Sequence, residues 1–313
     1  MKYISILAGA LGLMALAACT NNDEVKMDHP KEALTLKVAI GNGADTRLAF
    51  LDFDAKEGIK TEWEKDKDMI GLVEAGEDGA DAGPGTTVYS FKAQESGNPA
   101  TFVSEGTEPA DGIYLVGYPK DFIINGLTCA EQSGAYEDLK NYVILEGETK
   151  IENGKFTEEV EVFSPMIFLR IPAGTVFGDI YGKGESGYAI LAGPELYNAI
   201  DFTKPEDDRY VEGSIRITMA DDIFSETATK EVYLSKDFYI AVPRFDAITQ
   251  LTLEFVITDS PTSSTRYKYA IVTDESASDD DYVFAKFMQA GQVYTIEQNN
   301  LKLIEMVANI IVK

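Results

Sequence analysis

The sequence predicts an all-β protein, and three features of its pattern support this. Apolar residues recur at every second position in many short runs. Long runs with helical spacing are hard to find, and clusters of Gly, Asn, Asp and Pro separate the runs. With 313 residues, 45% of them hydrophobic and 11% aromatic, the chain has ample apolar material for a packed core.

The first element, residues 1–18, has the layout of an export signal. Lys2 supplies a positive start, Ile4 to Leu16 form an uncharged apolar core, and two small residues precede Cys19. The core is too short for a membrane-spanning helix, which needs roughly 20 apolar residues. The Leu-x-x-Cys ending resembles the lipobox of bacterial lipoproteins, which implies that Cys19 is acylated after cleavage. An ordinary secretory signal with a chance cysteine is the alternative.

The next element is a strand over Leu34 to Ile40. Every second residue is apolar from Leu34 onward, and a Gly41-Asn42-Gly43 turn signal follows. This alternation predicts that one face of the strand is buried. The further strands predicted in the first half are Thr87–Lys92, Gly112–Tyr118, Asn141–Leu145 and Val160–Phe163.

The second half continues the same alternation. The predicted strands are Met166–Ile171, Ile215–Met219, Val232–Leu234, Phe238–Val242, Leu251–Ile257, Arg266–Val272 and Gln292–Ile296. About a dozen strands are too many for one ordinary sandwich, so two domains are expected. We place the division near Ser164-Pro165, because proline disfavours a continuing central strand. The predicted domains are residues 48–164 and 165–313.

The chain ends on an apolar segment, residues 301–313. If this segment is extended, one face carries five residues: Ile304, Met306, Ala308, Ile310 and Val312. It can pair within its own domain as a last strand, and a last helix is the alternative. The β-branched run Ile310-Ile311-Val312 favours the strand.

Composition excludes several classes of function. The formal net charge of −26 argues against binding to nucleic acid or to an anionic membrane surface. His29 is the only histidine, so neither a histidine metal cluster nor a Ser-His-Asp triad is expected. With Cys19 acylated, Cys129 has no partner for a disulfide and is expected to be a small buried apolar residue. Composition does not exclude a pair of catalytic carboxylates, as in glycosidases, because the chain has 53 acidic residues, but no pattern marks such a pair. We expect no enzyme activity, no cofactor and no metal, and we interpret Asp279–Asp281 as a solvated turn rather than a calcium site.

Several segments in a fixed order resemble the fimbrillin family, the type V pilus subunits and related surface lipoproteins of Bacteroides-group bacteria. They begin with the lipobox at Cys19 and the strand at Leu34. The later segments are Thr46–Phe50, Trp63–Leu72, Tyr114–Pro119 and Ala290–Ile296. Lys67-Asp68 stands where the family usually has Gly-Asp.

The resemblance implies two transthyretin-like β-sandwich domains in tandem. It also implies an outer-membrane lipoprotein, exposed at the cell surface, whose leader (residues 19–47) carries a removable first strand. An arginine-specific protease would cut between Arg47 and Leu48, although Arg47 can also be an ordinary exposed arginine after a loop.

Removal of the leader would open the groove that Leu34 to Ile40 had filled. A neighbouring subunit could fill it by strand addition, and the face of Ile304, Met306, Ala308, Ile310 and Val312 is the candidate donor. A donated strand is a heterologous contact, which builds a filament. The resemblance therefore implies a structural pilus subunit that supports adhesion, as stalk, tip or anchor. The alternative is a lipid-anchored glycan-binding protein, which would need exposed aromatic residues, and Trp63 is the only tryptophan.

Overall fold

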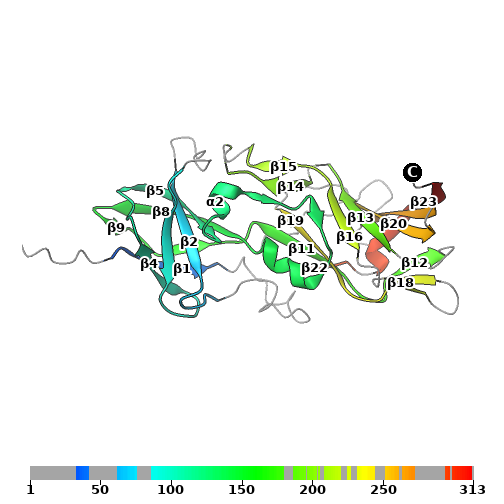
Figure 1. Ribbon diagram of the computed structural model, residues 1–313, viewed down its shortest axis with the longest axis horizontal. Coiled ribbons are helices and arrows are strands. Elements are labelled where there is room, and N and C mark those ends of the chain that lie inside the picture. The colour runs from blue at the N-terminus through cyan, green and yellow to red at the C-terminus, as the bar shows by residue number, and fades with distance from the viewer. Residues whose placement is uncertain are drawn as a thin grey trace, which may run out of the picture. The chain divides into compact units, whose positions relative to one another are not determined.

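A computed structural model describes most of the chain from Ala33 onward. The described residues are 33–41, 62–75, 86–179, 186–194, 196–202, 204, 208–219, 224–226, 231–243, 251–260, 263–271, 293–296 and 298–311. They belong to one compact unit. Strands dominate this unit, which confirms the all-β prediction (Figure 1). The prediction of two tandem domains divided near Ser164-Pro165 stays a prediction.

The strands of the first half are β1 (Thr35–Ile40), β2 (Met69–Glu74), β3 (Tyr89–Ala93), β4 (Ala100–Glu105), β5 (Gly112–Tyr118), β6 (Leu127–Thr128), β7 (Glu131–Gln132), β8 (Leu145–Glu152), β9 (Lys155–Phe156) and β10 (Val160–Val162). The helical turns are α2 (Phe122–Asn125) and the 3₁₀ helices η2 (Tyr136–Tyr142) and η4 (Gln298–Asn300).

The strands of the second half are β11 (Met166–Ile171), β12 (Val176–Asp179), β13 (Ser186–Ala192), β14 (Tyr197–Ile200), β15 (Tyr210–Glu212), β16 (Ile215–Met219), β17 (Phe224–Glu226), β18 (Glu231–Leu234), β19 (Phe238–Pro243), β20 (Leu251–Ser260), β21 (Ser263–Ile271), β22 (Val293–Thr295) and β23 (Leu301–Ile311).

The first sheet has eight strands in the order β10-β1-β4-β3-β2-β5-β8-β9. It curls on itself, because Glu146 of β8 and Phe163, directly after β10, exchange two main-chain hydrogen bonds of 2.9 and 2.8 Å. Its inward side chains contribute to the first core, whose largest fully buried members are Trp63, Tyr114, Phe91 and Phe102. Alternate residues of each strand fill this core, as the period-two pattern predicts.

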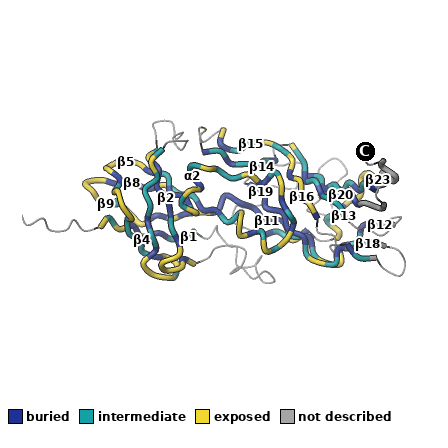
Figure 2. The backbone as a smooth tube through the Cα atoms, in the orientation of Figure 1, coloured by how far each residue is buried: buried dark blue, intermediate teal, exposed yellow. Residues whose placement is uncertain are grey.

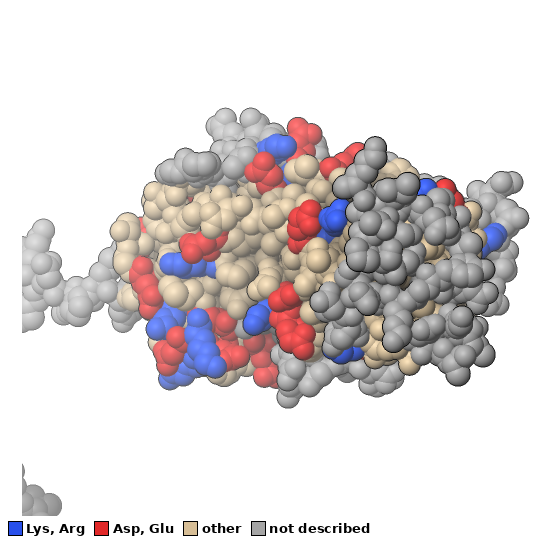
Figure 3. All heavy atoms as spheres, turned by 45° about the vertical axis from the view of Figure 1, so that its right-hand side comes forward, with Lys and Arg blue, Asp and Glu red and all other residues tan. Residues whose placement is uncertain are grey.

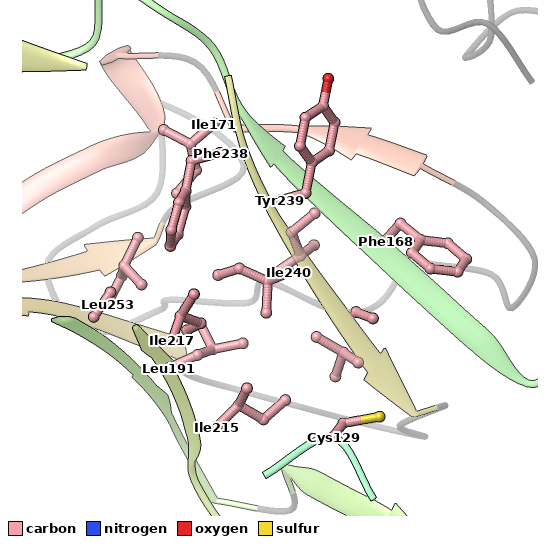
Figure 4. Close-up of a cluster of buried hydrophobic side chains, with 14 of the residues drawn as sticks. Cys129, Phe168, Ile171, Leu191, Ile215, Ile217, Phe238, Tyr239, Ile240 and Leu253 are labelled. Carbon is pink, nitrogen blue, oxygen red and sulfur yellow. The ribbon is translucent and has the colours of Figure 1, made fainter. Parts of the chain in front are cut away.

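The second core lies among four smaller sheets, with strand orders β19-β11-β22, β12-β18-β17, β23-β21-β20-β13-β16-β7 and β15-β14-β6. The central pair β11 and β19 is buried almost throughout (Figure 2). Phe238 and Ile240 of β19 and Leu253 of β20 belong to this core (Figure 4). Continuous apolar runs such as Met166-Ile167-Phe168-Leu169 suit strands that are buried on both faces.

Residues 122–144 precede Ser164-Pro165 in the chain but contribute to the second core. Phe122, Cys129 and Leu139 are buried in it. The Cys129 N–H donates to the carbonyl of Asn198 over 2.6 Å, and β6 pairs with β14. The second core therefore contains residues from both sides of Ser164-Pro165.

One predicted strand of the first half is wrong. Residues 136–142 form the 3₁₀ helix η2, and strand β8 begins only at Leu145, so Asn141–Leu145 is not a strand. A short apolar run fits either a helical or an extended pattern. Here η2 buries Leu139 in the second core, and the Tyr142 hydroxyl donates to the carbonyl of Glu131 over 3.2 Å.

Candidate functional site

The first strand, β1, lies inside its sheet, between β10 and β4, rather than at an edge. Its antiparallel pairing with β4 runs from Thr35↔Val103 to Val38↔Ala100. Its pairing with β10 is parallel and runs from Val38 to Ile40. Both edges of β1 are therefore paired. We call the space between β4 and β10 that β1 fills the β1 slot.

One face of β1 is completely buried. Leu36 and Val38 are 0% exposed and Ile40 is 6% exposed, whereas Thr35 and Lys37 face solvent. Burying an aliphatic side chain of this size contributes about 1.5–3 kcal/mol, so the three together contribute roughly 5–9 kcal/mol. This is comparable with the whole stability of a typical domain, about 5–15 kcal/mol. A chain without β1 would therefore need a replacement strand.

Two side chains from other segments bind the main chain of β1 near its end. The Trp63 indole Nε1 donates to the carbonyl of Val38 over 3.0 Å in a buried position. The Asn98 amide makes two bonds to Ile40: its Oδ1 accepts from the Ile40 N–H over 2.7 Å and its Nδ2 donates to the Ile40 carbonyl over 2.9 Å. Asn98 thus offers Ile40 the acceptor and donor that a neighbouring strand would offer.

The start of β1 is held in a similar way. Glu108 Oε1 accepts from the Leu34 N–H over 3.0 Å, and the Ser104 N–H donates to the Leu34 carbonyl over 3.0 Å. Lys37 pairs with Glu159 over 2.6 Å, but both side chains are largely exposed, so this ion pair contributes at most about 1 kcal/mol. Main-chain contacts and apolar burial therefore hold β1 more than its charges do.

Trp63 is itself held firmly in the first core. Its ring packs edge-on against Phe102 and Tyr118, with centroids 5.0 and 5.5 Å apart. The Tyr118 hydroxyl donates to Asp68 Oδ1 over 3.0 Å. Burial raises the pKa of Tyr118 well above its usual range, and the negative charge of Asp68 adds to the effect. At 1% exposure, Trp63 is unavailable for stacking on a glycan.

The carboxyl-terminal strand β23 lies at an edge. It ends the six-stranded sheet and pairs antiparallel with β21. The register of this pairing shifts at two places. The first shift leaves Ile304 without a partner in the register, and the second lies between Val307 and Ile310. These shifts interrupt the regular alternation assumed for the predicted donor face. Leu303 and Ile304 are both 47% exposed, so the strand presents large apolar side chains to solvent.

The other predicted site residues are placed as follows. Cys19, Arg47, Leu48 and Val312 lie outside the described residues. Met306, Ala308 and Ile310 lie on β23, opposite or beside residues of β21. Cys129 is buried in the second core (Figure 4), and burial raises the pKa of its thiol to about 12.

Sequence reasoning missed Asn98 and Glu108, because each lies in a polar loop with no motif around it. For Trp63, the sequence predicted a structural role but no contact with β1. The contacts of all three to β1 span between 25 and 74 residues of sequence. No local pattern signals such distant main-chain contacts.

On the face shown in Figure 3, acidic and basic side chains of the described residues are interspersed among uncharged ones. Among these residues, no group of His, Cys, Asp and Glu has the geometry to hold a metal ion. Nor does the described part of the chain contain a helix that is both long and apolar enough to cross a membrane.

No known protein family and no curated protein matches the chain. Solved structures do resemble it. One, described as a "putative cell adhesion protein" from Bacteroides uniformis ATCC 8492, is 11% identical, with 90% of this chain and 98% of that chain covered and a TM-score of 0.42. A second with the same description, from Bacteroides ovatus ATCC 8483, is 13% identical, with 90% and 96% covered and a TM-score of 0.39.

A third, described as a "fimbrial protein" from Bacteroides ovatus ATCC 8483, is 11% identical, with 86% of this chain and 49% of that chain covered and a TM-score of 0.34. These descriptions name the same kinds of protein as the fimbrillin resemblance. Because every one of these TM-scores is below 0.5, we base the functional proposal on the geometry of this chain.

Proposed function

We propose that this chain is a structural subunit of a surface fimbria that supports adhesion and assembles by strand exchange after its leader is removed. The observation that carries the proposal is the position of β1. It is close to the amino terminus and separated from the body by a long connection, yet it fills the inside of a sheet with Leu36, Val38 and Ile40. A strand in this position can be removed with the leader, and its loss leaves a slot with two unpaired edges.

The proposed route begins at the outer membrane, where lipid on Cys19 anchors the chain at the cell surface. An arginine-specific protease then cuts between Arg47 and Leu48. The cut releases lipid and β1 together, so the chain loses its anchor at the moment when its slot opens.

The proposed partner is a second pilus subunit whose strand enters the open slot. A strand added there regains ladder hydrogen bonds on both sides and buries alternate side chains. The edge position of β23, with Leu303 and Ile304 exposed, supports its role as donor. Each subunit then receives one strand and gives another, which produces an open filament rather than a closed ring.

The test is the amino-terminal residue of the protein in surface filaments, measured by mass spectrometry. We expect wild-type filament subunits to begin at Leu48. An Arg47→Lys variant keeps the positive charge but not the arginine, so an arginine-specific protease should leave it uncut. We expect that variant to begin at Cys19, to keep β1 and to form no filaments.

Filaments built of subunits that still begin at Cys19 would contradict assembly by leader removal. If surface material shows no filaments by electron microscopy and instead binds polysaccharides on a glycan array, the glycan-binding alternative replaces the proposal.

A further inference from the structure

The strand in the β1 slot is held by three side chains whose hydrogen bonds to it go to its main chain. Trp63 binds the carbonyl at position 38, Asn98 binds both main-chain groups at position 40, and Glu108 binds the N–H at position 34. None of these four hydrogen bonds involves a side chain of β1. Their strength therefore does not depend on the sequence of the strand, provided that positions 34 and 40 are not proline.

All three contacts lie along one edge of β1. Main-chain groups of alternate residues point to the same side of a strand, and positions 34, 38 and 40 have the same parity. The Ser104 N–H reaches the carbonyl at position 34 from β4, so this edge faces β4. The register with β4 covers positions 35 to 38, and Glu108 and Asn98 continue the hydrogen bonding beyond each end.

Trp63 and Asn98 are also linked to each other through the main chain. Trp63 and Gly97 exchange hydrogen bonds of 2.9 and 3.0 Å in an isolated bridge. The indole N–H and the amide therefore approach the strand from one rigid unit.

We propose that Trp63, Asn98 and Glu108 form a main-chain clamp that accepts strands of different sequence. We further propose that Ile304–Ile310 of a second copy of this chain takes the place of Leu34–Ile40 in the clamp. The first part stands on the structure of the single chain, and the second part rests on the proposed function.

Side-chain volume selects this register. The slot takes apolar residues at positions 34, 36, 38 and 40, and the donor face offers two registers of the correct parity. In the first, Ile304, Met306, Ala308 and Ile310 replace Leu34, Leu36, Val38 and Ile40. Only position 38 then changes volume appreciably, through the loss of two methyl groups, and Leu-to-Met or Leu-to-Ile exchange is well tolerated in cores.

The second register fits less well. Shifted by two residues, it places Ala308 at position 36 and Ile310 at position 38, and both positions are 0% exposed in this structure. The first of these changes leaves a cavity and the second overfills the core. Shape complementarity therefore favours Ile304–Ile310.

Position 41, directly after β1, can accommodate a residue larger than glycine from a donated strand. A Cβ atom added to Gly41 would meet Cε1 of Phe163 at 2.1 Å. Phe163 is 43% exposed, so its ring can turn outward. The isoleucine that follows Ile310 can then occupy this position.

The clamp is tested in the full chain, with β1 in place, by amide hydrogen exchange at residues 38–40. We expect Asn98→Leu and Trp63→Phe each to speed exchange there by about fivefold, because each removes hydrogen bonds to that segment. Asn98→Asp is a second variant of similar size that keeps an acceptor for the Ile40 N–H and replaces the Nδ2 donor by a carboxylate oxygen, which cannot donate to the Ile40 carbonyl. Gln298→Leu is the matched control, since the exposed Gln298 amide binds both main-chain groups of Val176 in β12. Unchanged exchange in all three clamp variants would overturn the clamp.

The register is tested with paired cysteines. Thr101 lies directly opposite Lys37 across β4 and β1, so Thr101→Cys with Lys37→Cys should form an intrachain disulfide in the unprocessed protein. A Cys19→Ser background leaves the buried Cys129 as the only other cysteine. This experiment tests, in the single chain and without filaments, whether residues 37 and 101 lie opposite each other.

In filaments, the proposed register places Val307 opposite Thr101 of the next copy. We expect Thr101→Cys with Val307→Cys to give disulfide-linked oligomers, and Thr101→Cys with Asn309→Cys to give none. Linkage through Asn309→Cys instead would overturn the register but not the proposed function. Filaments linked by neither pair would overturn Ile304–Ile310 as the occupant. A complete absence of filaments would contradict the proposed function, and the exchange measurement would still decide on the clamp.

Discussion

At three places in the described part of the chain, a side-chain amide takes the place of a neighbouring strand. Asn98 binds both main-chain groups of Ile40, and Gln298 does the same for Val176. Gln132 accepts from the Ala241 N–H over 2.8 Å and donates to its carbonyl over 2.6 Å. A primary amide carries one acceptor and two donors, so it can satisfy both groups of a strand residue at once. Single residues therefore complete ladders that no further strand reaches.

The three amides should differ in importance according to their burial. Gln132 is 7% exposed and its bonds to Ala241 are buried, whereas Gln298 is exposed. We expect Gln132→Leu to lower the free energy of unfolding by about 2–4 kcal/mol, because it leaves a buried donor and a buried acceptor unpaired. Gln298→Leu should cost less than about 1 kcal/mol, since water can replace the lost amide. Urea denaturation of both variants measures the difference, and equal losses would show that burial does not set it.

Among the elements, strands with strong alternation or continuous apolar runs could be predicted from the sequence. Gly112–Tyr118 and Met166–Ile171 have the predicted bounds, and the strand predicted at Leu34–Ile40 is β1. Strand β8 was predicted only at its first residue, because its sequence Leu-Glu-Gly-Glu-Thr-Lys-Ile-Glu has few apolar residues and a glycine. The inside position of β1 could be inferred only from the family resemblance, since pairing partners 62 to 68 residues away in β4 and 122 residues away in β10 leave no local signal.

The glycine of β8 explains how this weak strand closes the first sheet. A Cβ atom added to Gly147 would meet the Glu161 carbonyl oxygen at 2.7 Å and Val162 Cγ1 at 3.0 Å, so β8 and β10 approach more closely than a side chain allows. We expect Gly147→Ala to lower the free energy of unfolding by about 1–3 kcal/mol through this crowding. Gly112→Ala in the neighbouring β5 is the control, because its nearest contact would be an ordinary 3.4 Å to Tyr114. Thermal unfolding that shows equal stability for both variants would contradict close approach of β8 and β10.

At the scale of the whole molecule, buried tyrosines occur in both cores. Burial raises the pKa of Tyr118 in the first core and of Tyr269 in the second above the usual range. Burial also raises the pKa of Tyr239 to about 12, and the charge of Asp237 adds to the effect. Both cores therefore share one response to alkaline pH.

The sign of that response follows from the direction of the shifts. A tyrosine is neutral when protonated, and its unfolded pKa is about 10. When the folded pKa is higher, the folded state binds the proton more tightly than the unfolded state does, so this contribution to stability is complete below about pH 10 and is lost as the pH rises through the folded pKa. We expect stability to fall between about pH 10 and 12, with phenolate absorbance from the buried tyrosines appearing only as the chain unfolds. Tyr118→Phe removes one of these groups, so its stability should fall less steeply with pH, even though it loses the bond to Asp68. If all 16 tyrosines ionised near pH 10 while the circular dichroism of the folded sheets persisted, the common response of the two cores would be wrong.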